Sequence, residues 1–316
     1  MFNDTNFKKF YIRLPDSAFT TMHKEFVYYK VVYEGRSFQT AQWFTGVYKR
    51  YADWLQNNYY ELTVESFTEE TVKKFLMYGS SECNWKRNSL LNYFKGLKSF
   101  ADWLVEEKKL AANPFDNIKR PRQEFSMPVF LTKEEARQLM NYISTKKWSY
   151  NFERYRNMAI FGMFLYTGIR LAELLNIKMD DIDLSASTLR INKGKMQKDR
   201  MLPINDRLNR LLFEYQKDRQ RLMRNCEYYF VSSNRDQPLT RDGLKKLVAC
   251  IDKECGLKKH VSPHILRHTA ATLLLEATSD LDSVRNMLGH TTLAMSLRYS
   301  HASVSHLHKQ MAKIEI

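Results

Sequence analysis

Two consecutive stretches decide the fold: "YRNMAIFGMFLYTGIRLAELLNI" (residues 155–177) and "DIDLSASTLRINKGKMQKDRMLPI" (181–204). The first is apolar enough to predict a buried helix pair, with a turn at Thr167-Gly168. The second alternates apolar and polar residues, as strands do, and its centre "NKGKMQKD" predicts a tight basic β turn. Together they indicate an α-rich unit that carries a small antiparallel sheet.

Helices are also predicted upstream of this region. "SFQTAQWFTGVYKRYADWL" (37–55) and "SLLNYFKGLKSFADWLVEE" (89–107) each place aromatic and aliphatic residues on one apolar stripe at helical spacing. A third helix is predicted in "FTEETVKKFLMYG" (67–79), where Thr68 is the N-cap and acidic residues occupy the first turn. The stripes are interpreted as core, so residues 17–110 are expected to be helical.

A connector separates the two regions. "AANPFDNIKRPRQEFSMPVF" (111–130) contains three prolines and a basic run, which favour an extended chain. The "KRPR" run fits a DNA phosphate backbone and fits a solvated basic hinge equally well. Beyond it, Thr132 and Glu135 form a capping-box pattern that predicts the next helix. Helices are expected again after the hairpin.

Charge and composition narrow the class of protein. The chain of 316 residues has a net charge of +15, which favours a polyanionic partner because lysine and arginine displace counterions from phosphates. A merely basic surface is the alternative. The four cysteines form no CxxC pair, as in a reduced cytoplasmic protein. No membrane span and no secretory signal are predicted.

Residues suited to phosphodiester cleavage recur in the second half of the chain. The set is Arg170, Lys195, His264, Arg267, His290 and Tyr299. Two arginines can hold the non-bridging oxygens and stabilise transition-state charge. A tyrosine hydroxyl can attack phosphorus, while a lysine or histidine protonates the departing oxygen and another histidine takes the tyrosine proton. Fixed cations would neutralise charge, so no metal and no cofactor is expected.

Taken singly, these residues also have ordinary interpretations. A given tyrosine among 18 usually packs or lies on the surface. Lys195 is one of four cations in residues 193–200, so composition does not select it. His264 and His268 are four apart, as zinc ligands can be, but Arg267 lies between them and no third ligand stands out.

Four segments carry the set as an ordered group: "TGIRLAELLNIKMDDID", "KGKMQKDRMLPI", "HILRHTAAT" and "LGHTTLAMSLRYSH". In this order and spacing they resemble the catalytic domain of tyrosine recombinases, the Xer and phage-integrase family. Residues 20–120 resemble the family's N-terminal core-binding domain, including a final "NP…IK-P" from Asn113 to Pro121. The resemblance covers nearly the whole chain.

The resemblance implies a role for each residue. The "TG-x-R-x-x-E-L" element gives the first arginine as Arg170, with Glu173 as the accompanying acid. Lys195, eight residues before Pro203, is the hairpin lysine, and Lys193 is the fallback because Met196 replaces the family's second glycine. The other implied assignments are His264 and Arg267 from "H-x-L-R-H", His290 from "LGH", the nucleophile Tyr299, and His268 as a structural neighbour.

The expected fold is mainly α: a helical, SAM-like core-binding domain and an α-rich catalytic domain with a small antiparallel sheet. The resemblance divides the chain into an N-terminal extension (1–16), the core-binding domain (17–115), a linker (116–130) and the catalytic domain with its tail helix (131–316). This corresponds to a compact two-domain recombinase, without a large arm-binding domain before residue 17.

The function implied is site-specific DNA recombination through a covalent 3′-phosphotyrosine and a Holliday junction, without ATP or metal. Expected partners are double-stranded DNA sites, a homotetramer on paired sites and accessory DNA-bending proteins. No membrane is expected, and the location is cytoplasmic, with the nucleoid.

Two alternatives share the fold: a type IB topoisomerase-like enzyme and a non-catalytic DNA-binding regulator. The sequence leaves open the DNA target and the outcome, which is dimer resolution, integration, excision or inversion. It also leaves open whether Tyr299 acts in its own protomer and whether the tail docks on a neighbouring one.

Overall fold

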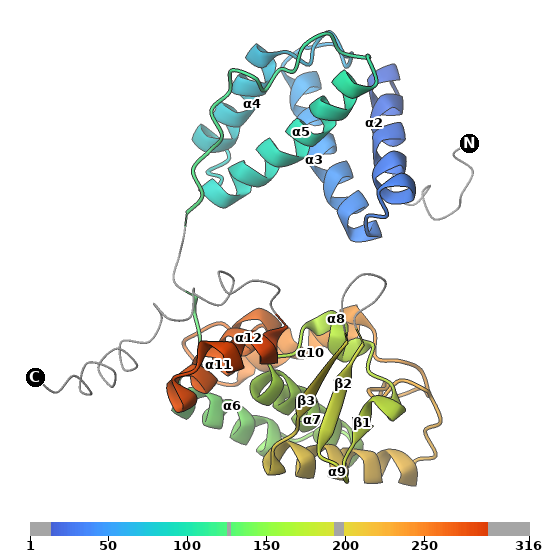
Figure 1. Cartoon of the computed structure of the whole chain (residues 1–316), viewed down its shortest axis with the longest axis vertical. Helices are drawn as coiled ribbons and strands as arrows, with labels where there is room; N and C mark the ends of the chain where they lie inside the picture. The colour runs from blue at the N-terminus through green and yellow to red at the C-terminus, as the bar shows by residue number, and fades with distance from the viewer. Residues whose placement is uncertain (1–13, 125–127, 193–198, 290–316) are drawn as a thin grey trace, which may run out of the picture. The chain divides into compact units, whose positions relative to one another are not determined.

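The computed structural model describes residues 14–124, 128–192 and 199–289. The chain forms two compact units, Met1–Phe125 and Ser126–Ile316 (Figure 1). The division between them falls inside the proline-containing connector predicted from the sequence. Each unit has its own apolar core, and each is described by itself.

The first unit is helical, as its apolar stripes predict. Its elements are α2 (Ala18–Tyr28), η1 (Tyr29–Tyr33), α3 (Phe38–Asn57), α4 (Glu69–Ser81) and α5 (Arg87–Glu106). Side-chain caps fix where helices begin. Ser37 Oγ accepts the Thr40 amide at 3.2 Å before α3. Thr68 and Thr71 form a reciprocal capping box before α4, which confirms Thr68 as the cap.

Aromatic rings fill the core of the first unit. Phe19, Tyr48 and Phe100 come from three different helices, and their ring centroids lie 5.4 to 5.9 Å apart. The stripes predicted in α3 and α5 are therefore core. Trp43, one residue of the α3 stripe, lies at its margin: it is 37% exposed and packs its ring on Phe44.

The second unit combines helices with three short strands. Its elements are α6 (Lys133–Thr145), α7 (Asn151–Thr167), α8 (Leu171–Leu175), η2 (Met179–Asp181), β1 (Ile182–Asp183), β2 (Thr188–Ile191), β3 (Arg200–Pro203), α9 (Asp206–Arg221), α10 (Arg241–Glu254), α11 (Pro263–Thr278) and α12 (Leu281–Leu288). Helix α7 is buried on all sides and packs against α6, α9 and α11, so it is the central helix that its uniform apolarity predicts.

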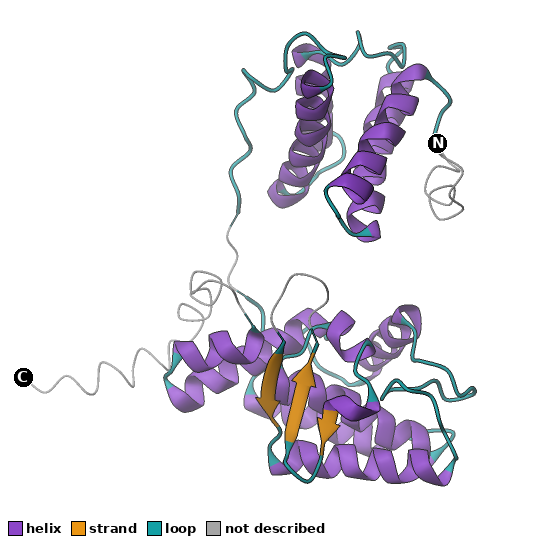
Figure 2. Ribbon diagram, turned by 45° about the vertical axis from the view of Figure 1, so that its right-hand side comes forward, coloured by secondary structure: helices purple, strands orange, loops and turns teal. Residues whose placement is uncertain are grey.

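The strands form one antiparallel sheet in the order β1-β2-β3 (Figure 2). Leu189 pairs with Leu202, and both are buried. Ile191 pairs with Arg200, so β2 and β3 form a hairpin whose connection is 192–199. The sheet therefore confirms the predicted strands. The centre of the predicted β turn, 193–198, lies outside the described residues.

The connector is anchored at both ends. Phe115 belongs to the first core and Leu131 to the second. The Leu131 amide donates to Thr269 Oγ1 on α11 at 2.9 Å, and the predicted capping box follows, with Thr132 and Glu135 bonded reciprocally. Among the helices in the described part of the chain, none is long and apolar enough to cross a membrane.

Candidate active site

A left-handed turn presents Arg170. Helix α7 ends at Thr167, and Gly168 follows with φ +59°. A Cβ atom on Gly168 would come within 2.8 Å of Leu288 Cδ2. An alanine would therefore strain the backbone and push the Leu288 side chain aside, and both effects favour glycine. The chain then reverses, and Arg170 becomes the N-cap residue of α8. Its side chain is 38% exposed. The sequence therefore predicted both the turn and the residue it presents.

Arg267 joins this turn to a second one. It projects from α11 and is 6% exposed. Its Nη1 donates to the Gly168 carbonyl, and its Nη2 donates to the Leu288 carbonyl at 2.8 Å. Leu288 ends α12, and Gly289 caps that helix with φ +63°. One guanidinium thus holds together the turn before Arg170 and the turn at Leu288-Gly289, which begins the "LGH" motif.

His264 lies at the start of the same helix. Ser262 caps α11 by accepting the Ile265 amide at 3.3 Å, and Pro263 occupies the first turn. His264 is exposed and stands one turn before Arg267, so both project from the same region of α11. Across residues 14–124, 128–192 and 199–289, no group of three or more His, Cys, Asp or Glu residues could hold a metal ion.

Glu173 carries the densest hydrogen bonding of the site. Its Oε1 accepts from Arg170 Nη1 at 2.7 Å and from Arg200 Nη1 at 3.0 Å. Its Oε2 accepts from the Arg170 amide at 3.0 Å and from Arg200 Nη2 at 2.9 Å. Burial raises the pKa of this carboxyl, but the bonds from the two arginines and the charge of Arg200 outweigh burial and lower the pKa to about 2. The carboxylate is therefore charged at neutral pH.

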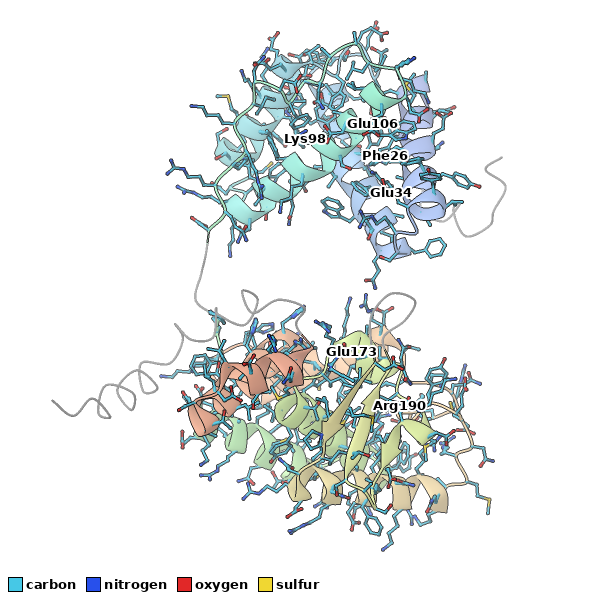
Figure 3. All side chains as sticks on the ribbon, in the orientation of Figure 1. Phe26, Glu34, Lys98, Glu106, Glu173 and Arg190 are labelled. Carbon is cyan, nitrogen blue, oxygen red and sulfur yellow. The ribbon has the colours of Figure 1, made fainter. Side chains whose placement is uncertain are left out.

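Arg200 is the contributor that sequence reasoning missed. It opens β3 directly after the connection that carries Lys195. Figure 3 labels Glu173, whose carboxylate accepts two hydrogen bonds from Arg200. No local signal could identify the pair, because 27 positions separate the two residues in the sequence.

Three of the six predicted residues, and the fallback Lys193, lie outside the described part. Lys195 and its fallback Lys193 fall in 193–198, while His290 and Tyr299 follow residue 289. The structure thus brings together Arg170, Arg267 and the accompanying Glu173. It places His264 on the helix of Arg267. The roles of all six residues stay predictions.

Comparison with known proteins gives the family. The profile of the Phage integrase family matches residues 129–306, more than half of the chain. The chain belongs to the phage integrase family.

Its relatives are tyrosine recombinases. XerC of Bacillus pumilus is 29% identical over 284 residues, covering 81% of this chain and 90% of that protein. XerC of Proteus mirabilis is 30% identical over 244 residues, covering 77% of this chain and 78% of that protein. XerD of Listeria innocua is 27% identical over 282 residues, covering 88% and 93%.

Solved structures share the fold. XerH bound to a palindromic difH substrate has a TM-score of 0.74 at 21% identity, covering 94% of this chain and 85% of that chain. A lambda integrase dimer bound to a COC′ core site has a TM-score of 0.69 at 16% identity, covering 98% and 83%. The predicted fold class is therefore confirmed. The family transfers DNA strands, and its members' likeness to this chain favours a site-specific recombinase over a topoisomerase or a regulator.

Proposed function

We propose that this recombinase cleaves and rejoins DNA with Tyr299 as its nucleophile. The tyrosine oxygen bonds to the scissile phosphorus, and the bond from phosphorus to the 5′ oxygen breaks. The products are a 3′-phosphotyrosine and a free 5′ hydroxyl. The bond energy is retained in the phosphotyrosine, so the reverse attack by a 5′ hydroxyl of the partner strand rejoins DNA without ATP.

Arg170 and Arg267 neutralise the phosphate in this proposal. Guanidinium groups donate forked hydrogen bonds to non-bridging oxygens, and they act most strongly on charge that gathers in the transition state. The observation that carries the proposal is the bridge from Arg267 to the Gly168 and Leu288 carbonyls. Through this bridge, one guanidinium bonds both the segment just before Arg170 and the segment just before His290.

Proton transfer is assigned to the remaining residues. Lys195, with Lys193 as the alternative, protonates the departing 5′ oxygen. Of His264 and His290, one is expected to bind the phosphate and the other to accept the tyrosine proton. The net charge of +15 supports double-stranded DNA as partner, and relatives such as XerH are described in complex with their DNA substrates.

The assembly belongs to the same proposal. The core-binding unit and the catalytic unit would clamp a duplex, and four protomers on two sites would exchange strands in pairs through a Holliday junction. Accessory DNA-bending proteins would assist the pairing. The protein would act on the nucleoid in the cytoplasm.

A plasmid assay tests the function as a whole. A plasmid carrying two copies of the candidate site, taken from the flanks of the gene, is incubated with wild-type protein and with Tyr299→Phe. The proposal predicts deletion or inversion between paired sites, none with the variant, and no change in a plasmid lacking sites. Relaxation of the siteless plasmid by wild type would instead indicate a topoisomerase.

A further inference from the structure

The four bonds to Glu173 do more than pair charges. Each carboxylate oxygen accepts one bond from Arg170 and one from Arg200. Because Glu173 holds both the guanidinium and the backbone amide of Arg170, any displacement of the carboxylate displaces Arg170. Arg170 lies at the start of α8, whereas Arg200 comes from the sheet. The two hydrogen bonds from Arg200, one to each oxygen, form a fork that fixes the plane of the carboxylate.

Exposure separates the three residues into two roles. The side chains of Glu173 and Arg200 are 11% and 10% exposed, whereas Arg170 is 38% exposed. Arg170 therefore offers a face to a ligand, while Glu173 and Arg200 lie behind it. Of the three side chains, Arg170 is therefore the one most accessible to a phosphate.

The paired hydrogen bonds of Arg200 explain why an arginine, and not a lysine, occupies this position. Arg200 Nε is buried and has no hydrogen-bond acceptor in the described part of the chain, which carries a desolvation cost. A lysine would supply the charge without this unsatisfied donor. What lysine lacks is the planar pair of donors that engages both oxygens at once.

The location of Arg200 adds a second connection. It is the first residue of β3 and pairs with Ile191, the last residue of β2. Arg200 thus closes the connection 192–199, which contains Lys195. In Figure 1, α8 lies at this end of the sheet. The fork therefore attaches the base of the lysine connection to the turn that presents Arg170.

We propose that Arg200 is a positioning residue for strand cleavage, acting through Glu173 on Arg170. This inference rests on the proposed function, since it assumes that Arg170 neutralises the scissile phosphate. Substitution of Arg200 should therefore lower the rate of strand cleavage and leave the affinity for DNA unchanged.

The test compares Arg200→Lys with a matched control, Arg190→Lys. Arg190 on β2 also pairs with a buried carboxylate: its Nε lies 3.0 Å from Asp181 Oδ1, and the Asp181 side chain is 2% exposed. Arg190 lies in the same sheet as Arg200, and Asp181 ends η2. In the described part of the chain, neither member of the pair is bonded to Arg170 or Glu173. Glu173→Gln is a second test variant, which keeps the shape and removes the charge. Melting temperature and DNA affinity are measured for each protein.

The readout is the rate of covalent complex formation on nicked DNA with two scissile groups. One is the natural phosphodiester. The other is a methylphosphonate, in which a methyl group replaces a non-bridging oxygen and removes the charge that Arg170 meets. Misplacement of Arg170 by a fraction of an ångström to an ångström should slow phosphodiester cleavage about 10- to 100-fold. On methylphosphonate the deficit of Arg200→Lys and Glu173→Gln should largely disappear, as it should for Arg170→Ala.

Two results would overturn the inference. One is an Arg200→Lys protein that cleaves the phosphodiester at the wild-type rate. The other is an equal deficit on both substrates, which indicates general damage. The control Arg190→Lys should stay within about twofold of wild type on both. Failure of the proposed function looks different: wild type would form no covalent complex, or Arg170→Ala would cleave the phosphodiester normally.

Discussion

Arg170 and Arg267 occupy different environments although both are assigned to one phosphate. Arg267 is 6% exposed and bonds two backbone carbonyls from distant segments. Arg170 is 38% exposed, and its partner Glu173 keeps Arg200 when Arg170 is removed. At the scale of the residue, Arg267 therefore has a structural task in addition to its proposed chemistry, and Arg170 has little structural task.

Urea unfolding should separate the two arginines. Arg267→Ala leaves two carbonyls without a charged donor in a buried site and should lower the free energy of unfolding by about 3 kcal/mol. Arg170→Ala removes a partly exposed ion pair and should lower it by less than about 1 kcal/mol. Both should lose cleavage by roughly 10²–10³-fold. Equal stability losses would contradict the distinction.

Glu173 should make the stability depend on acid pH. Its folded pKa of about 2 lies below the ordinary 4.5, so its contribution is complete above pH 4.5 and is lost as pH falls toward 2. Since one pKa unit corresponds to 1.36 kcal/mol, the loss is about 3 kcal/mol. Unfolding measured across this window should show a weaker pH slope for Glu173→Gln than for wild type.

A surface carboxylate is the control for the pH measurement. Glu254 also has a pKa lowered to about 2, by hydrogen bonds from Lys146, Tyr142 and Cys250, but it is an exposed group. Solvent screens such pairs, so Glu254→Gln should change the slope less than Glu173→Gln. The reverse order would show that Glu173 does not dominate the loss of stability at acid pH.

At the scale of the element, the sequence predicted the helix starts and the buried helix faces, because both depend on residues close together in the chain. Thr68 and Thr132 cap helices through neighbours three residues away, and the apolar stripes of α3 and α5 mark their buried faces. The connections that build the site are different. Arg267 reaches Gly168 across 99 positions, and Arg200 reaches Glu173 across 27. Propensity and spacing carry no information about such tertiary contacts. The family resemblance pointed to Arg267 and Glu173 but not to Arg200.

Two glycines provide a matched test of the Gly168 turn. Gly168→Ala places a Cβ against Leu288 at 2.8 Å with φ +59°, so it should destabilise the protein by about 1–3 kcal/mol and slow cleavage by displacing Arg170. Gly46→Ala lies inside α3, where a Cβ meets nothing within 4 Å, and should stabilise by up to about 1 kcal/mol. Thermal melting and the covalent-complex rate measure both effects.

Gly46→Ala should leave cleavage unchanged, because Gly46 lies in the other unit and on an exposed part of α3. A Gly168→Ala protein with wild-type stability and rate would show that the left-handed turn is dispensable. That outcome would separate Arg170 from the backbone geometry assigned to it.

At the scale of the whole molecule, charge predicts how the protein holds DNA. A net charge of +15 and two units joined by a basic connector favour many phosphate contacts. With about six to ten contacts, affinity should fall by roughly 10³–10⁵-fold between 50 and 200 mM salt. Binding titrations at four salt concentrations give the slope. A flat slope would contradict an interface built on phosphates.

The most direct measurement of the central claim is covalent trapping. Wild-type protein and Tyr299→Phe are mixed with labelled, nicked DNA that carries the cognate site, in the presence of EDTA. We predict a slow band that survives denaturant, disappears on proteinase treatment and forms only with wild type. A band that persists with Tyr299→Phe, or one that requires a divalent metal, would contradict a tyrosine nucleophile working among fixed cations.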